Sequence, residues 1–314
     1  MDLETFMSLP TGDVARLVQE RGPRVCVFPI NGTRRWFVLE HPEVKAEDYI
    51  DAYLAASGQR HLELYQLFFD HGINTLVTPI FGPDLLERGE VYDALLEQGL
   101  TWFAREEFLA FYDAHDVRVR VYGDARRYLQ KTVYASALGV YDEVTHRTAD
   151  HGRHRLFFGV CAHDAAEAVA QIGLRFHDRH HRLPTKSEIV EAYYGEPVEP
   201  VDIFIGFDRP AAFDMPLIAT GSEDLYFTVA PSPYLDETTL RAILFDHMYA
   251  RHVDDTDYEE LSADGWAFLD RFYRENRHAV LGLGRRHESG SFWYPLPQVR
   301  DIQGLAQSRE PTDT

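Results

Sequence analysis

Short apolar runs and longer amphipathic stretches alternate along this chain. The short runs are rich in Val, Ile and Phe, which favour β-strands and are often bounded by turn residues. They predict six strands, at Arg24–Ile30, Ile73–Phe81, Val117–Tyr122, Arg155–Ala162, Val201–Phe207 and Leu225–Ala230.

The stretches between these runs repeat apolar residues at spacings of three and four, which is typical of amphipathic helices. They predict helices at Glu47–His71, Glu90–His115, His163–His177 and Leu235–Arg251. Thr185 and Glu188 form a capping box that opens a short helix through Tyr194, and Gly195 ends it. Strands that alternate with helices predict an α/β fold with a mainly parallel central sheet flanked by helices.

The length and composition are compatible with one large folded unit. The chain has 314 residues, of which 45% are hydrophobic and 13% aromatic, so it has enough apolar material for a full core. No repeat or long linker divides it, and we expect a single domain over residues 1–303. The polar residues 304–314 are expected to form a flexible tail, and the acidic segment Asp254–Glu260 a solvated connector.

The charge balance narrows the choice of partners. With 31 Lys+Arg against 51 Asp+Glu, the formal net charge is −20. This speaks against binding to nucleic acid or to anionic membrane surfaces, which need a basic face. Nearly all cations are arginines, so a local arginine cluster is expected either to bind an anion or to pair with acids.

Several features indicate a cytoplasmic protein. Cys26 and Cys161 lie in apolar runs and are expected to be buried free thiols, as in a reducing compartment. No window approaches the roughly 18 apolar residues of a membrane-spanning helix. The segment Met1–Pro10 carries acids and lacks the basic start of a secretion signal.

The segment Pro29–Phe37, with the sequence PINGTRRWF, is the strongest candidate for a functional site. A glycine turn directly after a strand allows backbone N–H groups to approach a phosphate closely. The adjacent Arg34 and Arg35 can add bidentate, charge-assisted hydrogen bonds to phosphate oxygens. The pattern fits neither the P-loop nor the dinucleotide-binding template. Taken alone, it is equally compatible with an ordinary turn bearing surface arginines.

The order of four segments resembles the cis-prenyltransferase family, the undecaprenyl diphosphate synthase type. These segments are the glycine turn, FGPDLLERG at Phe81–Gly89, VRVRVYGD at Val117–Asp124, and the stretch Asp202–Phe227 with DIFIGFDR and DLYF. Further runs resemble a diterpene-forming branch of that superfamily, among them RGPRV at Arg21–Val25, EAYYGE at Glu191–Glu196 and LYFTVAPS at Leu225–Ser232. The resemblance implies the family's fold, a prenyl diphosphate substrate and a homodimer.

The resemblance also implies roles for single residues. It places the substrate diphosphate on the glycine turn and three arginines: Gly32, Thr33, Arg34, Arg35 and Arg88. A carbocation left after ionisation needs aromatic faces, which attract cations and offer no nucleophile. The aromatic candidates are Trp36, Tyr53 (or Tyr49), Phe81 and Tyr226, for which core packing is the alternative. The expected catalytic residues are Asn31, Arg34, Arg35, Tyr53 and Trp36.

Asn31 is the main departure from the family, which has Asp at this position to help hold Mg²⁺. An amide oxygen is a weaker, neutral ligand for Mg²⁺. Three readings stay open: the metal binds through the diphosphate, Asn31 and Asp224; the arginines replace it; or catalysis is weakened. The family's second diphosphate site is also altered, because Gly206 replaces its first arginine. We therefore expect that only one diphosphate is bound.

The function predicted from these features is a diterpene synthase. It would ionise a bicyclic C20 prenyl diphosphate of the labdane, clerodane or halimane type and release pyrophosphate. Water capture or proton loss would then give an alcohol or an alkene. The alternative is a transferase that moves the diterpenyl group to a nucleophile such as adenosine, and a third reading is a non-catalytic partner subunit. Mg²⁺ is the expected cofactor.

Overall fold

Six parallel strands form one central sheet in a computed structural model that describes residues 1–301 except 88–92, 212–216, 252–260, 289–292 and 298. The strand order is β3-β4-β2-β1-β5-β6. The strands are β1 Val25–Val27, β2 Thr75–Phe81, β3 Val117–Tyr122, β4 His154–Val160, β5 Ile203–Phe207 and β6 Asp224–Thr228. All six predicted strands and the α/β fold class are confirmed. The tail at 304–314 and the connector Asp254–Glu260 lie outside the described residues.

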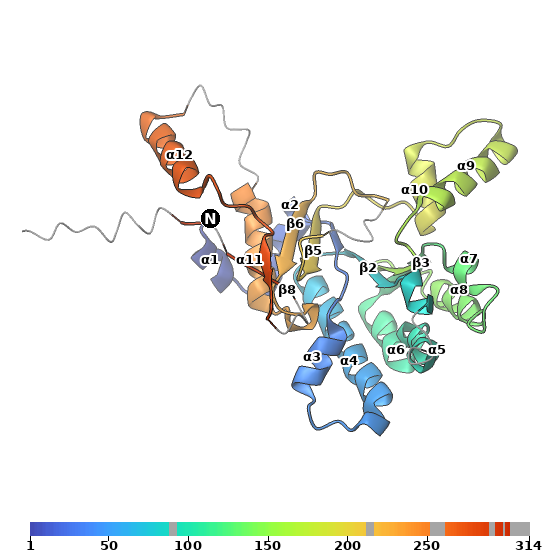
Figure 1. Ribbon diagram of the computed structural model, residues 1–314. Helices are drawn as coiled ribbons and strands as arrows, with labels where there is room; N and C mark the ends of the chain where they lie inside the picture. The colour runs from blue at the N-terminus through green and yellow to red at the C-terminus, as the bar shows by residue number, and fades with distance from the viewer. Residues whose placement is uncertain (88–92, 212–216, 252–260, 289–292, 298, 302–314) are drawn as a thin grey trace, which may run out of the picture.

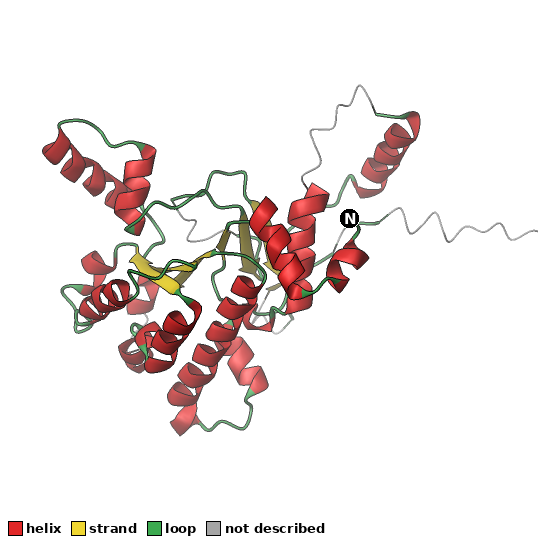
Figure 2. Ribbon diagram, turned by 180° about the vertical axis from the view of Figure 1, so that it is seen from behind, coloured by secondary structure: helices red, strands yellow, loops and turns green. Residues whose placement is uncertain are grey.

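Helices flank the sheet, and α9 and α10 project from it as a hairpin (Figures 1 and 2). The α-helices are α1 Leu3–Ser8, α2 Thr11–Arg21, α3 Thr33–Glu40, α4 Tyr49–Asp70, α5 Asp93–Gly99, α6 Glu106–His115, α7 Ala125–Leu129, α8 Ala137–Arg147, α9 Ala166–His180, α10 Lys186–Tyr194, α11 Glu237–Phe245 and α12 Ala263–Asn276. Shorter elements are the 3-10 turns η1 Ala46–Asp48, η2 Pro83–Glu87, η4 Trp102–Ala104 and η5 Ser232–Tyr234, the π-helical turn η6 Asp246–Arg251, and a hairpin of β7 Gly284–Arg286 and β8 Trp293–Pro295.

One predicted helix start is confirmed in detail, and one predicted helix is wrong. The capping box at α10 is confirmed, since the Thr185 side chain accepts a hydrogen bond from the Glu188 N–H and the Glu188 side chain accepts one from the Thr185 N–H.

In the part of the chain that the structure describes, no helix is both long and apolar enough to span a membrane.

The predicted continuous helix Glu90–His115 is wrong, because the chain leaves the helical path at Gly99. A Cβ at Gly99 would lie 3.3 Å from the Phe81 ring, so the chain passes closely over the end of β2 here. The extended Arg105 then starts α6. The break leaves Trp102 in a 3-10 turn, where its side chain is only 7% exposed.

Both faces of the sheet are covered, as parallel strands require. Side chains alternate along a strand: Cys26 and Phe28 belong to the large core cluster that also contains side chains of α4, α6, α8 and α11, whereas Val25 and Val27 belong to a smaller one with α10. Cys26 and Cys161 are buried thiols that are not joined in a disulfide, as expected.

The position of β1 in the sheet determines where a ligand can bind. β1 pairs with β2 on one side and with β5 on the other, and the chain crosses from β4 to reach β5. Ligands of open α/β sheets bind beyond the carboxyl ends of the strands at such a switch point. Asn31 follows β1 and Asp208 follows β5, so both lie at this edge.

Gly32 makes the turn from β1 into α3. It precedes the helix in a left-handed conformation, with φ 75° and ψ 12°. A Cβ there would lie 2.7 Å from the Phe207 ring and 3.0 Å from Cβ of Pro231. Only glycine therefore fits both the conformation and the space.

Gly32→Ala is expected to lower the free energy of unfolding by about 2 kcal/mol, because the left-handed conformation is strained for alanine and the ring of Phe207 must move. Urea denaturation measures this. The matched control is Gly139→Ala in α8, where a new Cβ meets nothing within 4 Å. The control is expected to leave stability unchanged or raise it by about 0.5–1 kcal/mol. Equal effects of the two changes would contradict the account of Gly32.

Candidate active site

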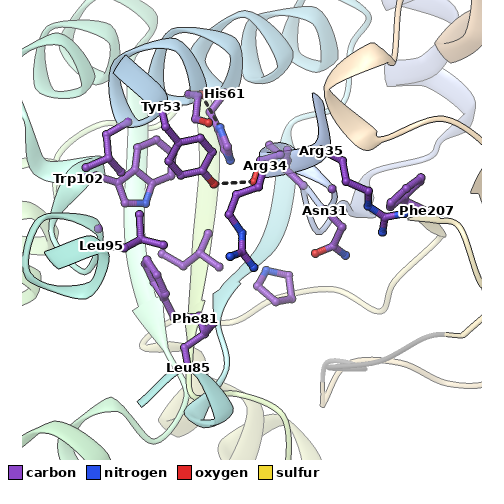
Figure 3. Close-up of a pocket in the computed structure, with 18 of the residues that line it drawn as sticks. Asn31, Arg34, Arg35, Tyr53, His61, Phe81, Leu85, Leu95, Trp102 and Phe207 are labelled. Atoms are coloured by element: carbon purple, nitrogen blue, oxygen red, sulfur yellow. Dashed lines mark hydrogen bonds between the residues drawn. The ribbon is translucent and has the colours of Figure 1, made fainter. Parts of the chain in front are cut away.

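A cavity of about 590 Å³ opens at the switch point, within the range of small-molecule sites. It is bordered by the turn after β1, the face of α4, the end of β2, the α5–η4 segment and the chain after β5 (Figure 3). Its lining residues include Asn31, Gly32, Thr33, Arg34, Arg35, Tyr53, Leu54, Ser57, His61, Phe81, Leu85, Leu95, Trp102, Phe207, Asp208 and Arg209. One side is cationic and the other mostly apolar.

The cationic side is built on the start of α3. The first hydrogen bond of the helix runs from the Trp36 N–H to the Gly32 carbonyl oxygen, at 2.9 Å. The backbone N–H groups of Thr33, Arg34 and Arg35 therefore have no acceptor within the helix. The side chains of Arg34 and Arg35 line the cavity together with Arg209, which comes from the segment after β5. Backbone N–H groups at a helix start beside guanidinium groups form an anion site.

Asp208 is the acid next to these arginines. Its carboxylate lies 3.4 Å from the Arg35 guanidinium, and Arg35 also lies over the Phe207 ring, 4.8 Å from its centre. Asp208 has φ 68°, so the chain turns sharply out of β5 at this point. Arg35 is still more than half exposed, and this weak surface pair leaves it available to an incoming anion.

Asn31 is fixed through its backbone and leaves one side-chain donor unused. Its N–H donates to Ser232 Oγ at 3.1 Å, and its carbonyl accepts from the Ser232 N–H at 3.0 Å. The side-chain nitrogen Nδ2 is buried and has no hydrogen-bond partner among the described residues. A buried donor of this kind, beside three arginines, suits an anionic ligand.

The opposite side of the cavity is aromatic and aliphatic. Tyr53 on α4, Phe81 at the end of β2 and Trp102 face it, together with Leu85 and Leu95 (Figure 3). The Tyr53 hydroxyl shares a 2.7 Å hydrogen bond with Thr33 Oγ1, which ties α4 to the start of α3. Of the two tyrosines considered from the sequence, Tyr53 lines the cavity, and Tyr49 is not among the lining residues.

Two polar lining residues on α4 were not found from the sequence. Ser57 and His61 lie on α4, one and two turns beyond Tyr53, and their side chains are buried. Burial lowers the pKa of His61 to about 4, so its imidazole is neutral at pH 7. The sequence did carry a signal for them: Tyr53, Ser57 and His61 follow one another at spacings of four, and residues so spaced share one face of a helix.

Other predicted residues lie away from the cavity. The Trp36 ring packs near His41, with ring centres 5.8 Å apart, and the Tyr226 hydroxyl donates to Asp246 at 2.8 Å. Neither residue is among those that line the cavity. Arg88 lies outside the described residues.

Asp224 stands at the opposite edge of the sheet from Asn31. It is the first residue of β6 and pairs with Ile203, the first residue of β5. The cavity begins at Phe207, the last residue of β5, about 13 Å further along the strands at 3.3 Å per residue. Asp224 is held there by His247 Nδ1 at 2.7 Å and by Arg251. Within one chain, the structure therefore does not bring Asn31 and Asp224 together as metal ligands.

Comparison with known proteins identifies relatives of the whole chain. It is 43% identical over 292 residues to the tuberculosinyl adenosine transferase of Mycobacterium tuberculosis, covering 92% of this chain and 96% of that protein. It is 29% identical over 282 residues to the (+)-kolavelool synthase of Herpetosiphon aurantiacus, covering 88% and 91%. No family model matches the chain.

Solved structures share the fold. The lavandulyl diphosphate synthase of Lavandula x intermedia, in complex with dimethylallyl diphosphate, aligns with a TM-score of 0.58 at 13% identity over 76% of this chain and 97% of its own. A probable undecaprenyl diphosphate synthase of Campylobacter jejuni aligns with a TM-score of 0.53, also at 13% identity, over 72% and 95%. The predicted resemblance is confirmed. The chain belongs to the family of the tuberculosinyl adenosine transferase, and it has the fold of the cis-prenyltransferases.

Proposed function

We propose that the protein is a diterpene synthase that ionises a bicyclic C20 allylic diphosphate and releases pyrophosphate. The observation that carries the proposal is one cavity in which a cationic turn faces an aromatic wall. Such a cavity suits a substrate with a diphosphate at one end and a hydrocarbon at the other. We further propose that it works as a homodimer, as the family resemblance implies.

The cationic side supplies the driving force for ionisation. Breaking the allylic C–O bond places negative charge on the departing diphosphate, and cations already in position stabilise that charge. Gly32 allows the backbone to approach the diphosphate, and Arg34 and Arg35 donate to its oxygens. Arg35 exchanges Asp208 for the diphosphate when the substrate binds.

The lining residues do not form a good Mg²⁺ site. Mg²⁺ prefers carboxylate oxygens, phosphate oxygens and water. Among the described residues that line the cavity, Asp208 is the one that carries a carboxylate, and this carboxylate is paired with Arg35. The unused buried group of Asn31 is a donor, which suits a diphosphate oxygen and not a cation. We therefore assign stabilisation of the leaving group to the arginines and the Asn31 amide, and no step to Mg²⁺.

The aromatic wall protects the carbocation. Tyr53, Phe81 and Trp102 present ring surfaces with a negative quadrupole face, and a desolvated cation over such a face gains about 2 kcal/mol. Thr33 holds the Tyr53 hydroxyl at 2.7 Å, which fixes the position of that ring. Exclusion of bulk water by the wall limits premature capture.

A second candidate is transfer of the same cation to adenosine. The 43% identity to a tuberculosinyl adenosine transferase favours it, whereas similarity to the kolavelool synthase favours the synthase reaction. Both reactions begin with the same ionisation, and they differ in the nucleophile that ends it.

Purified protein is expected to release pyrophosphate from bicyclic C20 diphosphates when it is tested on a panel of linear and bicyclic C15 and C20 substrates. Mass spectrometry of the products with and without adenosine separates the two candidates. A synthase forms the same alcohol or alkene in both cases, and a transferase forms an adenosine adduct. Activity only on isopentenyl diphosphate with a short allylic primer would contradict both, and inactivity on every substrate would favour a non-catalytic subunit.

Arg35→Ala is expected to slow pyrophosphate release about 100-fold, because it removes a charge-assisted donor to the leaving group. The free energy of unfolding should change little, since Arg35 is more than half exposed. Arg16→Ala is the matched control: Arg16 is an exposed arginine on α2 paired with Asp13. A similar rate for the two variants would remove Arg35 from the diphosphate site.

Asn31→Asp is expected to make turnover depend on Mg²⁺. The new carboxylate repels the diphosphate unless a cation lies between them. The variant should therefore lose activity with EDTA and recover it with added Mg²⁺, while the wild-type rate changes much less. Pyrophosphate release measured across a Mg²⁺ titration provides the comparison. An equally strong Mg²⁺ requirement in both proteins would refute the assignment of Asn31 as a diphosphate donor.

A further inference from the structure

Two polar side chains interrupt the apolar wall of the cavity on α4. Ser57 and His61 are 6% and 7% exposed, and both line the cavity. They are four residues apart and so share one helix face. The Trp102 ring centre lies 4.5 Å from that of His61, in an edge-to-face arrangement. His61 thus lies on the hydrocarbon side of the cavity, and Figure 3 shows Arg34 between it and Asn31.

The tautomer of His61 follows from its hydrogen bond within the described part of the chain. Nδ1 lies 2.6 Å from the Ser57 carbonyl oxygen. A carbonyl only accepts, so Nδ1 carries the ring proton and Nε2 presents a lone pair. The hydroxyl of Ser57 is buried and has no partner among the described residues. The cavity-lining face of α4 therefore carries a buried hydroxyl at Ser57 and an acceptor nitrogen at His61, one helical turn apart.

Packing alone does not explain these two residues. A buried hydroxyl without a partner costs about 1–3 kcal/mol, and Ala and Leu at these positions would fill the wall without that cost. A water molecule that bridged the two groups would give the Ser57 hydroxyl the partner that it lacks among the described residues, because a buried water makes two to four hydrogen bonds. The Ser57 hydroxyl can donate to the water oxygen, and Nε2 of His61 can accept one of its protons.

We propose that Ser57 and His61 hold the water that captures the carbocation, and that His61 Nε2 takes the proton of that water. This inference rests on the proposed function, and it selects water, and not a nucleoside, as the nucleophile.

Bonds, electrons and protons balance in this step. Ionisation breaks the allylic C–O bond, and the bonding electron pair leaves with the diphosphate. A lone pair of the water oxygen then forms the new C–O bond, and one O–H bond of that water breaks as its proton passes to Nε2. The products are a diterpene alcohol and an imidazolium, which gives its proton to solvent as the alcohol leaves. The protonated alcohol that forms when water adds to the carbocation is a strong acid, so a weakly basic imidazole is sufficient to take its proton.

The test uses Ser57→Ala and His61→Leu with a C20 diphosphate in ¹⁸O-labelled water. The wild-type protein should form an alcohol that carries ¹⁸O. In both variants the ratio of alcohol to alkene should fall about tenfold or more, because the water that captures the cation is no longer held. A merely structural role would lower the rate and leave this ratio unchanged. Ser57→Ala is the milder change and tests the proposal even where His61→Leu does not fold.

Tyr65→Phe is the matched control. It removes another buried hydroxyl of α4, one turn beyond His61, from a side chain that is not among the cavity-lining residues. The control should keep the wild-type product ratio. An unchanged ratio in both Ser57→Ala and His61→Leu, with normal pyrophosphate release, would overturn this proposal alone. Absence of pyrophosphate release from the wild-type protein would instead contradict the proposed function, and this proposal with it.

Discussion

The pairing of β1 with β2 on one side and β5 on the other is the constraint on which the site depends. Val27 is in register with Val77 of β2 and Phe204 of β5. Because all three strands are parallel, the segments that follow them meet at one edge of the sheet. The turn with Asn31, the end of β2 with Phe81 and the turn with Asp208 therefore border the same cavity.

The parts of the fold that could be predicted are those whose burial appears in the sequence as an unbroken run of apolar residues. Strands covered on both faces are apolar at nearly every position, and all six were found. Helices were harder, because their ends depend on neighbours: Gly99 lies against Phe81, a contact that local spacing does not encode. The short helix α1 and the three-residue strands β7 and β8 were not predicted, because they are too brief to show a hydrophobic period. The amphipathic helices α2, α8 and α12 were also missed, although their apolar residues recur at helical spacing.

The site was predictable where its residues are contiguous. Asn31 to Arg35 lie in one turn, so a single motif placed them together. Arg209, Ser57 and Trp102 reach the cavity from other segments, and only the topology joins them. Among the predicted site residues that lie elsewhere, two do so because of their place on β6. Tyr226 lies in the middle of β6 and packs against the large core cluster, and Asp224 is the amino-terminal residue of the same strand.

The charge of the cavity is more informative than the net charge of −20. Arg34, Arg35 and Arg209 face one carboxylate, Asp208, so this part of an acidic protein is locally cationic. An acid at position 31 would add a second negative charge at the point where the turn meets a diphosphate, and a divalent cation would be needed to offset it. In the proposed function, the neutral amide of Asn31 removes that requirement and contributes a donor. The same substitution that weakens a metal site therefore strengthens a site for the anion itself, because the arginines no longer share their charge with a second acid.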